Sequence, residues 1–316
     1  MRAAMVKSRE ELALAEVAEP APARGHVLIE VAAVGVGFMD VLARRGEYYD
    51  FPGPGAVPGV EVAGLVTEVG AETSEEWIGK EVLAVLPAFG GYAERAVADA
   101  DRLFPLAGTG VDAAGAVALG VNAFVADIAS HRAGIRAGER VLVLGAGGGI
   151  GVLATQAARA RGAEVTVVTS SAERGARLRA LGAAHVVDRT RSPLDDGDSY
   201  DVVVDTVAGP ALGQNLHRLR PNGRYLLCGA AGGPPQPEAL AALLTDFHRS
   251  PTLFAFSLNS VRPEDLQASW QRITAMLRDG SLAPVVDQRS PLTDADAALR
   301  RVESGTPFGK VVLLPR

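Results

Sequence analysis

A glycine-rich segment near the middle of the 316-residue chain constrains the fold more than any other feature. Residues 140–144 form an apolar run that predicts a buried strand, and a helical pattern ends at about residue 161. Between the two lie Gly145, Gly148, Gly149, Ile150 and Gly151. A backbone without Cβ atoms can approach a pyrophosphate closely, and a helix N-terminus offers free N–H groups. The strand–turn–helix context therefore predicts a dinucleotide-binding loop.

The spacing of these glycines departs from G-x-G-x-x-G in a way that leaves two alignments open. Counted back from Gly148 and Gly151, the first glycine position holds Ala146. The alternative uses Gly145, Gly148 and Gly151 at three-residue spacing.

Alternating strands and helices surround this segment. Apolar runs predict strands at 164–169, 184–187, 201–205, 223–228 and 252–256, with helices at 172–181 and 211–219. This alternation is typical of a parallel sheet with helices on both faces. The first hundred residues differ, because short valine-rich runs separated by Gly and Pro favour a sandwich or barrel. The tail predicts a helix that begins at Pro263 and is stopped by Gly280, a second helix at 293–304 and a last strand at 310–314.

Composition excludes several classes of function. The net charge of −6 argues against a nucleic-acid-binding protein, which needs a basic surface. The single cysteine excludes an intramolecular disulfide and a Cys-rich zinc site. The apolar stretch 113–129 is interrupted by Asn122 and Asp127, so we expect it to be too short and too polar to span a membrane. With no signal-peptide pattern at the start, we expect a soluble, cytoplasmic protein.

The end of the second strand predicts which dinucleotide is bound. An NAD site needs an acid there for the ribose 2′-OH, but the chain has Thr-Ser-Ser, including Ser170 and Ser171. We interpret the next acid, Glu173, as the partner of Ser170 in a capping box. Arg174 and Arg189 are candidates to bind a 2′-phosphate, so we expect NADPH as the cofactor.

Several motifs taken together point to a family. They are residues 35–40 (Gly-Val-Gly-Phe-Met-Asp), 58–64 (Pro-Gly-Val-Glu-Val-Ala-Gly), the 145–151 loop, 201–205 and 308–313. The chain resembles the medium-chain dehydrogenase/reductase superfamily, specifically its zinc-free quinone oxidoreductase branch. The resemblance implies an α/β fold with a GroES-like β-barrel domain at 1–115, a Rossmann doubly wound parallel sheet at 116–258, and a return to the first domain at 259–316. It also implies a homodimer.

Departures from the family pattern bear on the chemistry. Zinc-dependent relatives carry Cys where this chain has Gly37 and His where it has Val60, and neither replacement can bind zinc. We therefore expect no metal. In the zinc-free branch, Gly37 stands where Asn is common and Asn122 where Thr is common.

The resemblance also suggests site residues. Tyr48 matches a tyrosine that faces the substrate cleft and is the candidate proton donor. Asp40, Asn122 and Phe256 are predicted to line the cleft. The loops after the fifth and sixth strands are predicted to edge the cofactor pocket, through Gly229, Ala230, Ser257 and Asn259.

Metal-free chemistry favours particular small-molecule acceptors. A quinone or an α,β-unsaturated carbonyl accepts hydride readily, because the charge spreads into a hydroquinone or an enolate. We therefore expect an NADPH-dependent reductase of such acceptors. Two alternatives stay open: an enoyl reductase for polyketide-type acyl thioesters, with an acyl carrier protein as partner, and a non-catalytic NADPH-binding protein.

Overall fold

The chain folds into two compact units, as the computed structural model shows for residues 1–191, 194, 195 and 197–315. The first unit comprises residues 1–121, 261–278 and 284–316, and the second comprises 122–260 and 279–283. This division runs close to the predicted boundaries at 115/116 and 258/259. It adds one feature, a short segment of the tail (279–283) that belongs to the second unit.

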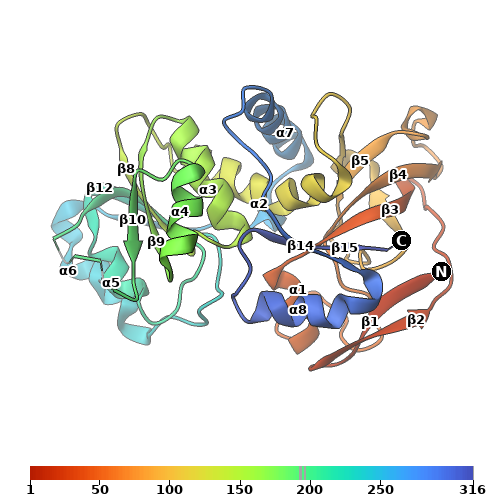
Figure 1. Cartoon of the computed structure of the whole chain (residues 1–316), viewed down its shortest axis with the longest axis horizontal. Helices are drawn as coiled ribbons and strands as arrows, with labels where there is room; N and C mark the ends of the chain where they lie inside the picture. The colour runs from red at the N-terminus through yellow and green to blue at the C-terminus, as the bar shows by residue number, and fades with distance from the viewer. Residues whose placement is uncertain (192–193, 196, 316) are drawn as a thin grey trace. The chain divides into compact units, whose positions relative to one another are not determined.

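The first unit is built mainly of β-strands (Figure 1). A seven-stranded sheet has the order β14-β15-β3-β4-β5-β7, with β6 paired to β3, and β1 pairs with β2 separately. The strands are β1 (Arg2–Ser8), β2 (Glu11–Glu16), β3 (His26–Val36), β4 (Glu61–Val69), β5 (Glu81–Val85), β6 (Arg95–Asp99), β7 (Leu103–Pro105), β14 (Val286–Pro291) and β15 (Lys310–Leu314). The helices are α1 (Phe38–Arg45), α7 (Pro263–Arg278) and α8 (Ala295–Glu303), with 3₁₀ turns η1 (Glu75–Trp77), η2 (Ala100–Arg102) and η6 (Leu292–Asp294).

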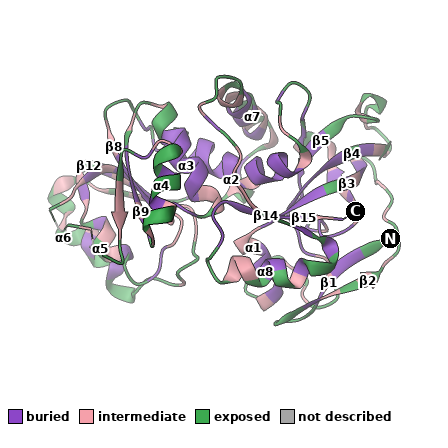
Figure 2. Ribbon diagram, in the orientation of Figure 1, coloured by how far each residue is buried: buried purple, intermediate pink, exposed green. Residues whose placement is uncertain are grey.

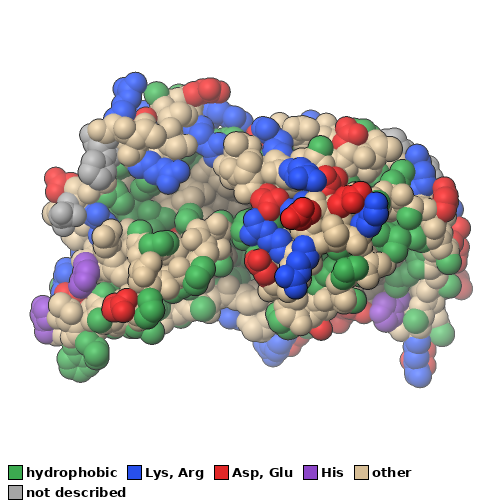
Figure 3. All heavy atoms as spheres, turned by 90° about the horizontal axis from the view of Figure 1, so that it is seen from below, with side chains coloured by type: hydrophobic (Ala, Val, Ile, Leu, Met, Phe, Trp, Pro, Cys, Tyr) green, Lys and Arg blue, Asp and Glu red, His purple; other side chains and the backbone are tan. Residues whose placement is uncertain are grey.

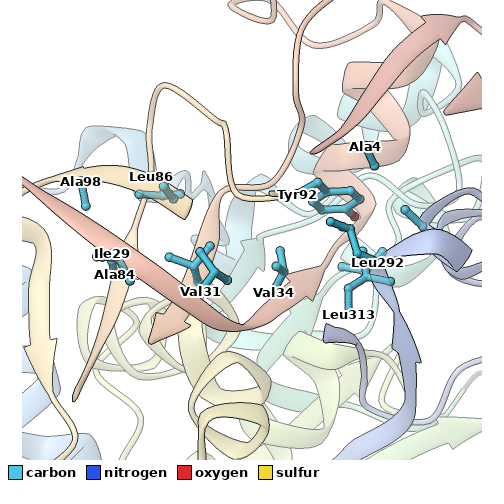
Figure 4. Packing of buried hydrophobic residues seen from close by; sticks show 14 of the residues in the cluster. Ala4, Ile29, Val31, Val34, Ala84, Leu86, Tyr92, Ala98, Leu292 and Leu313 are labelled. Carbon is cyan, nitrogen blue, oxygen red and sulfur yellow. The ribbon is translucent and has the colours of Figure 1, made fainter. Parts of the chain in front are cut away.

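One apolar core holds the first unit together. Ile29, Val31 and Val34 of β3 are buried, and Leu313 of the C-terminal strand packs into the same cluster (Figure 4). Tyr92 lies in this core with no exposed surface. Residues from both ends of the chain thus complete a single core, which explains why the tail returns to the first unit.

The second unit contains a six-stranded parallel sheet of order β10-β9-β8-β11-β12-β13. Its strands are β8 (Arg140–Leu144), β9 (Glu164–Thr169), β10 (His185–Asp188), β11 (Tyr200–Asp205), β12 (Leu219–Leu227) and β13 (Thr252–Ala255). Its helices are α3 (Gly149–Ala160), α4 (Ala172–Ala180), α5 (Leu212–Leu216) and α6 (Ala241–Thr245), with turns η3 (Pro237–Leu240), η4 (Phe247–Arg249) and η5 (Leu258–Ser260). This parallel sheet beside a β-rich first unit agrees with the predicted α/β fold class.

The apolar stretch expected to be too short for a membrane span lies in one long helix, α2 (Ala113–Arg132). Its 20 residues are long and apolar enough to cross a membrane, whereas the sequence predicted a segment too short and too polar. The apolar window is nevertheless 83% buried inside the fold, and Figure 2 shows α2 and α3 mostly in the colour of buried residues. The helix is therefore a core helix. It is kinked at Gly120, which has φ 31° and ψ −137°.

The segment before β12 differs from its predicted structure. Helix α5 ends at Leu216, and β12 begins at Leu219 instead of residue 223. The Pro-Asn-Gly sequence at 221–223 indicates a turn, but Asn222 adopts a positive φ of 60° inside the strand. The pairing register shifts there, so the chain forms an irregularity within β12 and stays in the sheet.

Charged side chains on the surface are mixed in sign. In the view from below, Lys and Arg side chains lie among Asp and Glu side chains (Figure 3). On that face no continuous basic patch is visible of the kind that binds nucleic acid.

Candidate functional site

The glycine loop of the second unit is shaped by close backbone contacts. Gly145 has a positive φ of 71°, and a Cβ there would overlap the hydroxyl of Thr206. A Cβ on Gly151 would overlap the carbonyl oxygen of Gly145, so the first turn of α3 lies against the loop. The N–H of Gly148 donates to the same carbonyl at 3.0 Å. Both positions therefore require glycine, in accord with the three-residue spacing of Gly145, Gly148 and Gly151.

The N-terminus of α3 is the anion-binding element of this loop. Gly148 is its N-cap and has no side chain to accept a hydrogen bond from the first turn. The N–H groups of Gly149, Ile150 and Gly151 have no acceptor within the helix, because the first turn of a helix never does. Free N–H groups and the positive end of the helix dipole suit a pyrophosphate. The residues present therefore fit a dinucleotide.

Asn122 lies beside this helix terminus. A Cβ on Gly149 would overlap the side-chain nitrogen of Asn122, and only 8% of Asn122 is exposed. The structure thus places this residue, predicted for the substrate cleft, against the glycine loop of its own unit.

Arg174 lies over the loop. A Cβ on Gly147 would lie 3.0 Å from the Cζ of the Arg174 guanidinium, so the glycine makes room for the arginine. Helix α4 positions this side chain from its first turn. The N-cap of α4 is Ser171, whose hydroxyl accepts a hydrogen bond from the N–H of Arg174 at 3.2 Å. The predicted capping box of Ser170 and Glu173 is therefore wrong by one residue.

Arg189 is tied to the same strand end. Its N–H donates to the carbonyl of Thr169, the last residue of β9, at 3.0 Å, and its side chain is exposed. Arg174 and Arg189 thus both adjoin the point where an NAD-specific site would carry an acid.

The loops after β12 and β13 contain the remaining predicted cofactor residues. A Cβ on Gly229 would overlap the carbonyl oxygen of Thr206. Ala230 accepts a hydrogen bond from the N–H of Gly233 at 3.0 Å. The hydroxyl of Ser257 accepts one from the N–H of Asn259 at 3.3 Å. Hydrogen bonds and close contacts within the unit therefore fix both loops.

Two further side chains in this unit are packed. Phe256 is 7% exposed, and the guanidinium of Arg132 lies 5.2 Å from the centre of its ring. Burial raises the pKa of the Cys228 thiol to about 12, so the thiol stays protonated at neutral pH. Phe256 is thus packed inside its unit, and the Cys228 thiol does not act as a nucleophile.

A second polar group lies buried in the first unit. Asp40 has no exposed surface and accepts hydrogen bonds from the N–H of Gly37 at 2.8 Å, the N–H of Gly59 at 3.0 Å and the hydroxyl of Tyr92 at 3.1 Å. Burial raises its pKa to about 6, although these bonds and Lys310 favour the charged form. Burial, together with Asp40, also raises the pKa of Tyr92. This geometry gives Asp40 the role of joining three chain segments.

Glu61 and Lys310 form a buried ion pair that the sequence analysis did not single out. Their side chains are 1% and 4% exposed. The other carboxylate oxygen of Glu61 accepts a hydrogen bond from the N–H of Val121 at 2.7 Å, at the kink after Gly120. The only sequence signal was that both residues lie within family motifs, because residues so far apart in the chain show no local pattern.

Tyr48 is half-buried at the edge of an apolar cluster that includes Val60 and Phe89. Its ring meets that of Phe89 edge to face at 5.4 Å and stacks on Tyr49 at 5.0 Å. Tyr49 is 80% exposed. The two neighbouring tyrosines thus differ in environment, and Tyr48 alone adjoins the cluster.

The residues at the family's zinc-ligand positions do not fit a metal. Gly37 has no side chain and Val60 is apolar. Within the part of the chain that the structure describes, no group of three or more His, Cys, Asp or Glu side chains could hold a metal ion.

Comparisons with known proteins identify the family. Residues 23–108 match the alcohol dehydrogenase GroES-like domain, and residues 181–313 match the zinc-binding dehydrogenase family. The mouse quinone oxidoreductase is 33% identical over 312 residues, which cover 95% of this chain and 92% of the relative. The Streptomyces halstedii polyketide synthase GfsB is 33% identical over 294 residues, which cover 92% of this chain and 5% of that protein.

Two solved structures extend these matches. A quinone oxidoreductase from Pseudomonas syringae pv. tomato DC3000 has a TM-score of 0.91 at 28% identity, with both chains fully covered. A mycobacterial protein complexed with NADPH has a TM-score of 0.89 at 27% identity, again with full coverage of both chains. The chain belongs to the medium-chain dehydrogenase/reductase superfamily. Within it, the chain is an oxidoreductase of the quinone oxidoreductase branch.

Proposed function

We propose that this protein is an NADPH-dependent, zinc-independent reductase that transfers a hydride to a quinone or an α,β-unsaturated carbonyl. Two observations support a quinone- or enone-type reductase with a nicotinamide cofactor. They are the quinone oxidoreductase relatives and the similarity to the mycobacterial structure complexed with NADPH. The observation that carries the choice of NADPH is the Arg174 guanidinium over Gly147, beside a strand end without an acid.

The binding steps follow from the second unit. The open N–H groups of Gly149 to Gly151 hold the pyrophosphate. Arg174 and Arg189 bind the 2′-phosphate through charge-assisted hydrogen bonds. When bound, the cofactor supplies the hydride, and the protein supplies position and electrostatics.

The absence of metal ligands at residues 37 and 60 supports acceptors that need no Lewis acid. A conjugated carbonyl disperses the incoming charge into an enolate, and a quinone disperses it into a hydroquinone. Tyr48 orients the acceptor and donates a proton, and solvent serves as an alternative donor.

A panel of acceptors tests this proposal. The purified protein is mixed with NADPH or NADH and with quinones, enones or acyl thioesters, and cofactor oxidation is followed by absorbance. We expect turnover of quinones or enones with NADPH, unchanged by EDTA, and much less than one zinc per chain. Stoichiometric zinc on which activity depends would contradict the proposal. NADPH binding without oxidation by any acceptor would instead favour a non-catalytic NADPH-binding protein.

The match to a polyketide synthase favours one second candidate, an enoyl reductase for acyl thioesters on a carrier protein. Faster turnover of acyl thioesters than of free enones would support it. A further gain when the same acyl chain is attached to an acyl carrier protein would identify the carrier as a partner.

We also propose a soluble, cytoplasmic homodimer. The outer edge of β13 has no strand partner among the described residues, and its sequence, Thr-Leu-Phe-Ala, carries no charge to discourage pairing. Just before it, Leu244 and Phe247 are 79% and 77% exposed. A second copy would cover both features. Light scattering should give twice the chain mass, and Phe247→Lys should shift the protein towards monomer.

A further inference from the structure

Phe89 of the first unit has a strained backbone. Its φ is 65°, in the left-handed region where a bulky side chain is rarely found. Only 6% of Phe89 is exposed, so this conformation does not belong to a loose surface loop. Strained residues of this kind persist only where the surrounding structure fixes them, and they gather at functional sites.

Backbone hydrogen bonds on both sides of Phe89 fix this conformation. The N–H of Phe89 donates to the carbonyl of Leu86 at 3.1 Å and closes a turn. The N–H groups of residues 90–92 donate to carbonyls of residues 57–59 at 2.9 to 3.1 Å. Leu86 and Tyr92, at the two ends of this segment, are buried in the apolar core (Figure 4). The strain at residue 89 is therefore held from both ends.

The strained backbone places the Phe89 ring against the candidate proton donor. The ring meets those of Tyr48 and Phe51 edge to face, with centroids 5.4 and 4.9 Å apart. Edge-to-face pairs are directional, so the place of one ring restricts the other. Tyr48 also stacks on Tyr49, but that ring is 80% exposed. Phe89 thus gives Tyr48 a buried ring contact that the surface does not supply.

We propose that Phe89 is a positioning residue, whose ring fixes the side-chain rotamer of Tyr48 and with it the place of the phenol hydroxyl. This inference rests on the proposed function, in which Tyr48 orients the acceptor and donates a proton. A proton donor acts only within hydrogen-bond reach of the atom that receives the proton. Without the Phe89 ring, Tyr48 would populate other rotamers, and the hydroxyl would leave that position more often.

Phe89→Leu tests the role of the ring. We expect kcat on an enone to fall by about 10–100-fold, because misplacing a reacting group by about 1 Å costs up to about 10²-fold. NADPH affinity should be unchanged, and quinones should lose less, since they take protons from solvent. Phe104→Leu is the matched control. Phe104 is a buried ring of the same unit that meets Trp270 at 5.7 Å. The control should lower the Tm at least as much and leave kcat unchanged.

Phe89→Gly separates the ring from the strain in the backbone. Glycine adopts φ 65° without strain, so this variant keeps the turn and loses the ring. We expect the same fall in kcat as in Phe89→Leu, with each variant assayed well below its Tm. Wild-type kcat in either variant, or an equal fall in Phe104→Leu, would overturn the inference.

A double-mutant cycle with Tyr48→Phe tests whether Phe89 acts through the Tyr48 hydroxyl. If it does, adding Phe89→Leu to Tyr48→Phe should lower kcat by less than about twofold, since residues that act as a unit are not additive. Losses that multiply in the double variant would overturn the inference.

NMR of 3-fluorotyrosine-labelled protein provides a readout that does not depend on turnover. The chain has five tyrosines, and the signal lost in Tyr48→Phe identifies Tyr48. We expect Phe89→Leu to shift this signal and Phe104→Leu to leave it in place. An unmoved Tyr48 signal in Phe89→Leu would overturn the inference. If Tyr48→Phe keeps full enone activity, the proposed role of Tyr48 fails, but a signal that moves in Phe89→Leu alone would still show that Phe89 positions the ring.

Discussion

The two polar regions of this molecule differ in the groups that form them: one consists of backbone N–H groups and the other of side chains. In the second unit, the glycine loop offers backbone N–H groups, and its specificity comes from glycines at which a Cβ would overlap a neighbour. In the first unit, the buried group of Asp40, Glu61, Tyr92 and Lys310 is made of side chains that pair with one another or with nearby N–H groups. The loop is open to a ligand, whereas the side chains of the buried group already pair with one another or with N–H groups of their own unit.

This difference predicts two kinds of mutational outcome. Removing one member of a buried ion pair leaves an uncompensated charge, so the free energy of unfolding falls. Removing a side chain that is proposed to bind a ligand should change the affinity for that ligand more than the free energy of unfolding. The following predictions test that division, beginning with the largest expected effect.

Lys310→Met should have the largest effect. Lys310 and Glu61 are 4% and 1% exposed, and breaking such a pair from one side costs about 3–5 kcal/mol. Denaturant unfolding measures the loss. The double variant Lys310→Met/Glu61→Gln should recover most of it, because no charge is then left alone. A single variant within about 1 kcal/mol of wild type, well below that range, would show that the pair is solvated.

Tyr48→Phe should change catalysis and leave stability intact. It keeps the ring against Phe89 and removes the hydroxyl. We expect kcat on an enone to fall by about 10–1,000-fold, less than the full range for a positioned acid wherever solvent substitutes. Quinones should lose less, and NADPH affinity should be unchanged. Tyr49→Phe is the control, because Tyr49 is 80% exposed. Full enone activity in Tyr48→Phe would assign the proton to another source.

The contribution of Asp40 to the free energy of unfolding should fall as the pH rises. Its pKa is about 6 in the folded protein against 3.8 for an ordinary Asp, so between these values the folded state binds the extra proton. Stability from this group is therefore full below pH 3.8 and is lost as the pH rises through about 6, by about 3 kcal/mol at most. Between pH 4 and pH 7 the free energy of unfolding of the wild type should fall relative to that of Asp40→Asn, by up to this amount. Parallel curves would mean that Asp40 stays charged throughout.

Arg174→Ala should act mainly on the affinity for the cofactor. A charge-assisted hydrogen bond contributes about 1.5–3 kcal/mol, so the NADPH dissociation constant should rise by about 10–150-fold. NADH affinity and unfolding should hardly change. Equal losses for both cofactors would show that Arg174 does not bind the 2′-phosphate.

The sequence predicted the second unit better than the first for a physical reason. Strands β8 and β9 match their predicted bounds, and the loop glycines were found, because hydrophobic runs and glycine spacing are local signals. The contact between Asp40 and Tyr92 joins residues 52 positions apart, and Lys310 reaches Glu61 from the other end of the chain. No local pattern encodes such contacts, so the ion pair was missed and Asp40 was assigned to the cleft.

The smallest predicted effect concerns the N-cap of α4, where the local signal was ambiguous. Ser170 and Ser171 are adjacent, and either could begin a helix at Ala172. The structure selects Ser171, whose hydroxyl accepts from the N–H of Arg174. Ser171→Ala should therefore lower the free energy of unfolding by about 1 kcal/mol, while Ser170→Ala should leave it unchanged.

The same two variants test whether a loss of stability can be separated from a loss of NADPH affinity. The hydroxyl of Ser171 holds the backbone of Arg174 and not its guanidinium, so losing it frays the first turn without removing the charge. NADPH affinity should then fall far less than in Arg174→Ala, by about 2–5-fold at a cost of about 1 kcal/mol. Titration of cofactor fluorescence measures this loss. If Ser171→Ala weakens NADPH as much as Arg174→Ala does, the cap and the arginine act as one unit. If Ser170→Ala produces the larger loss in both measurements, the capping box read from the sequence describes the protein in solution better than the Ser171 cap.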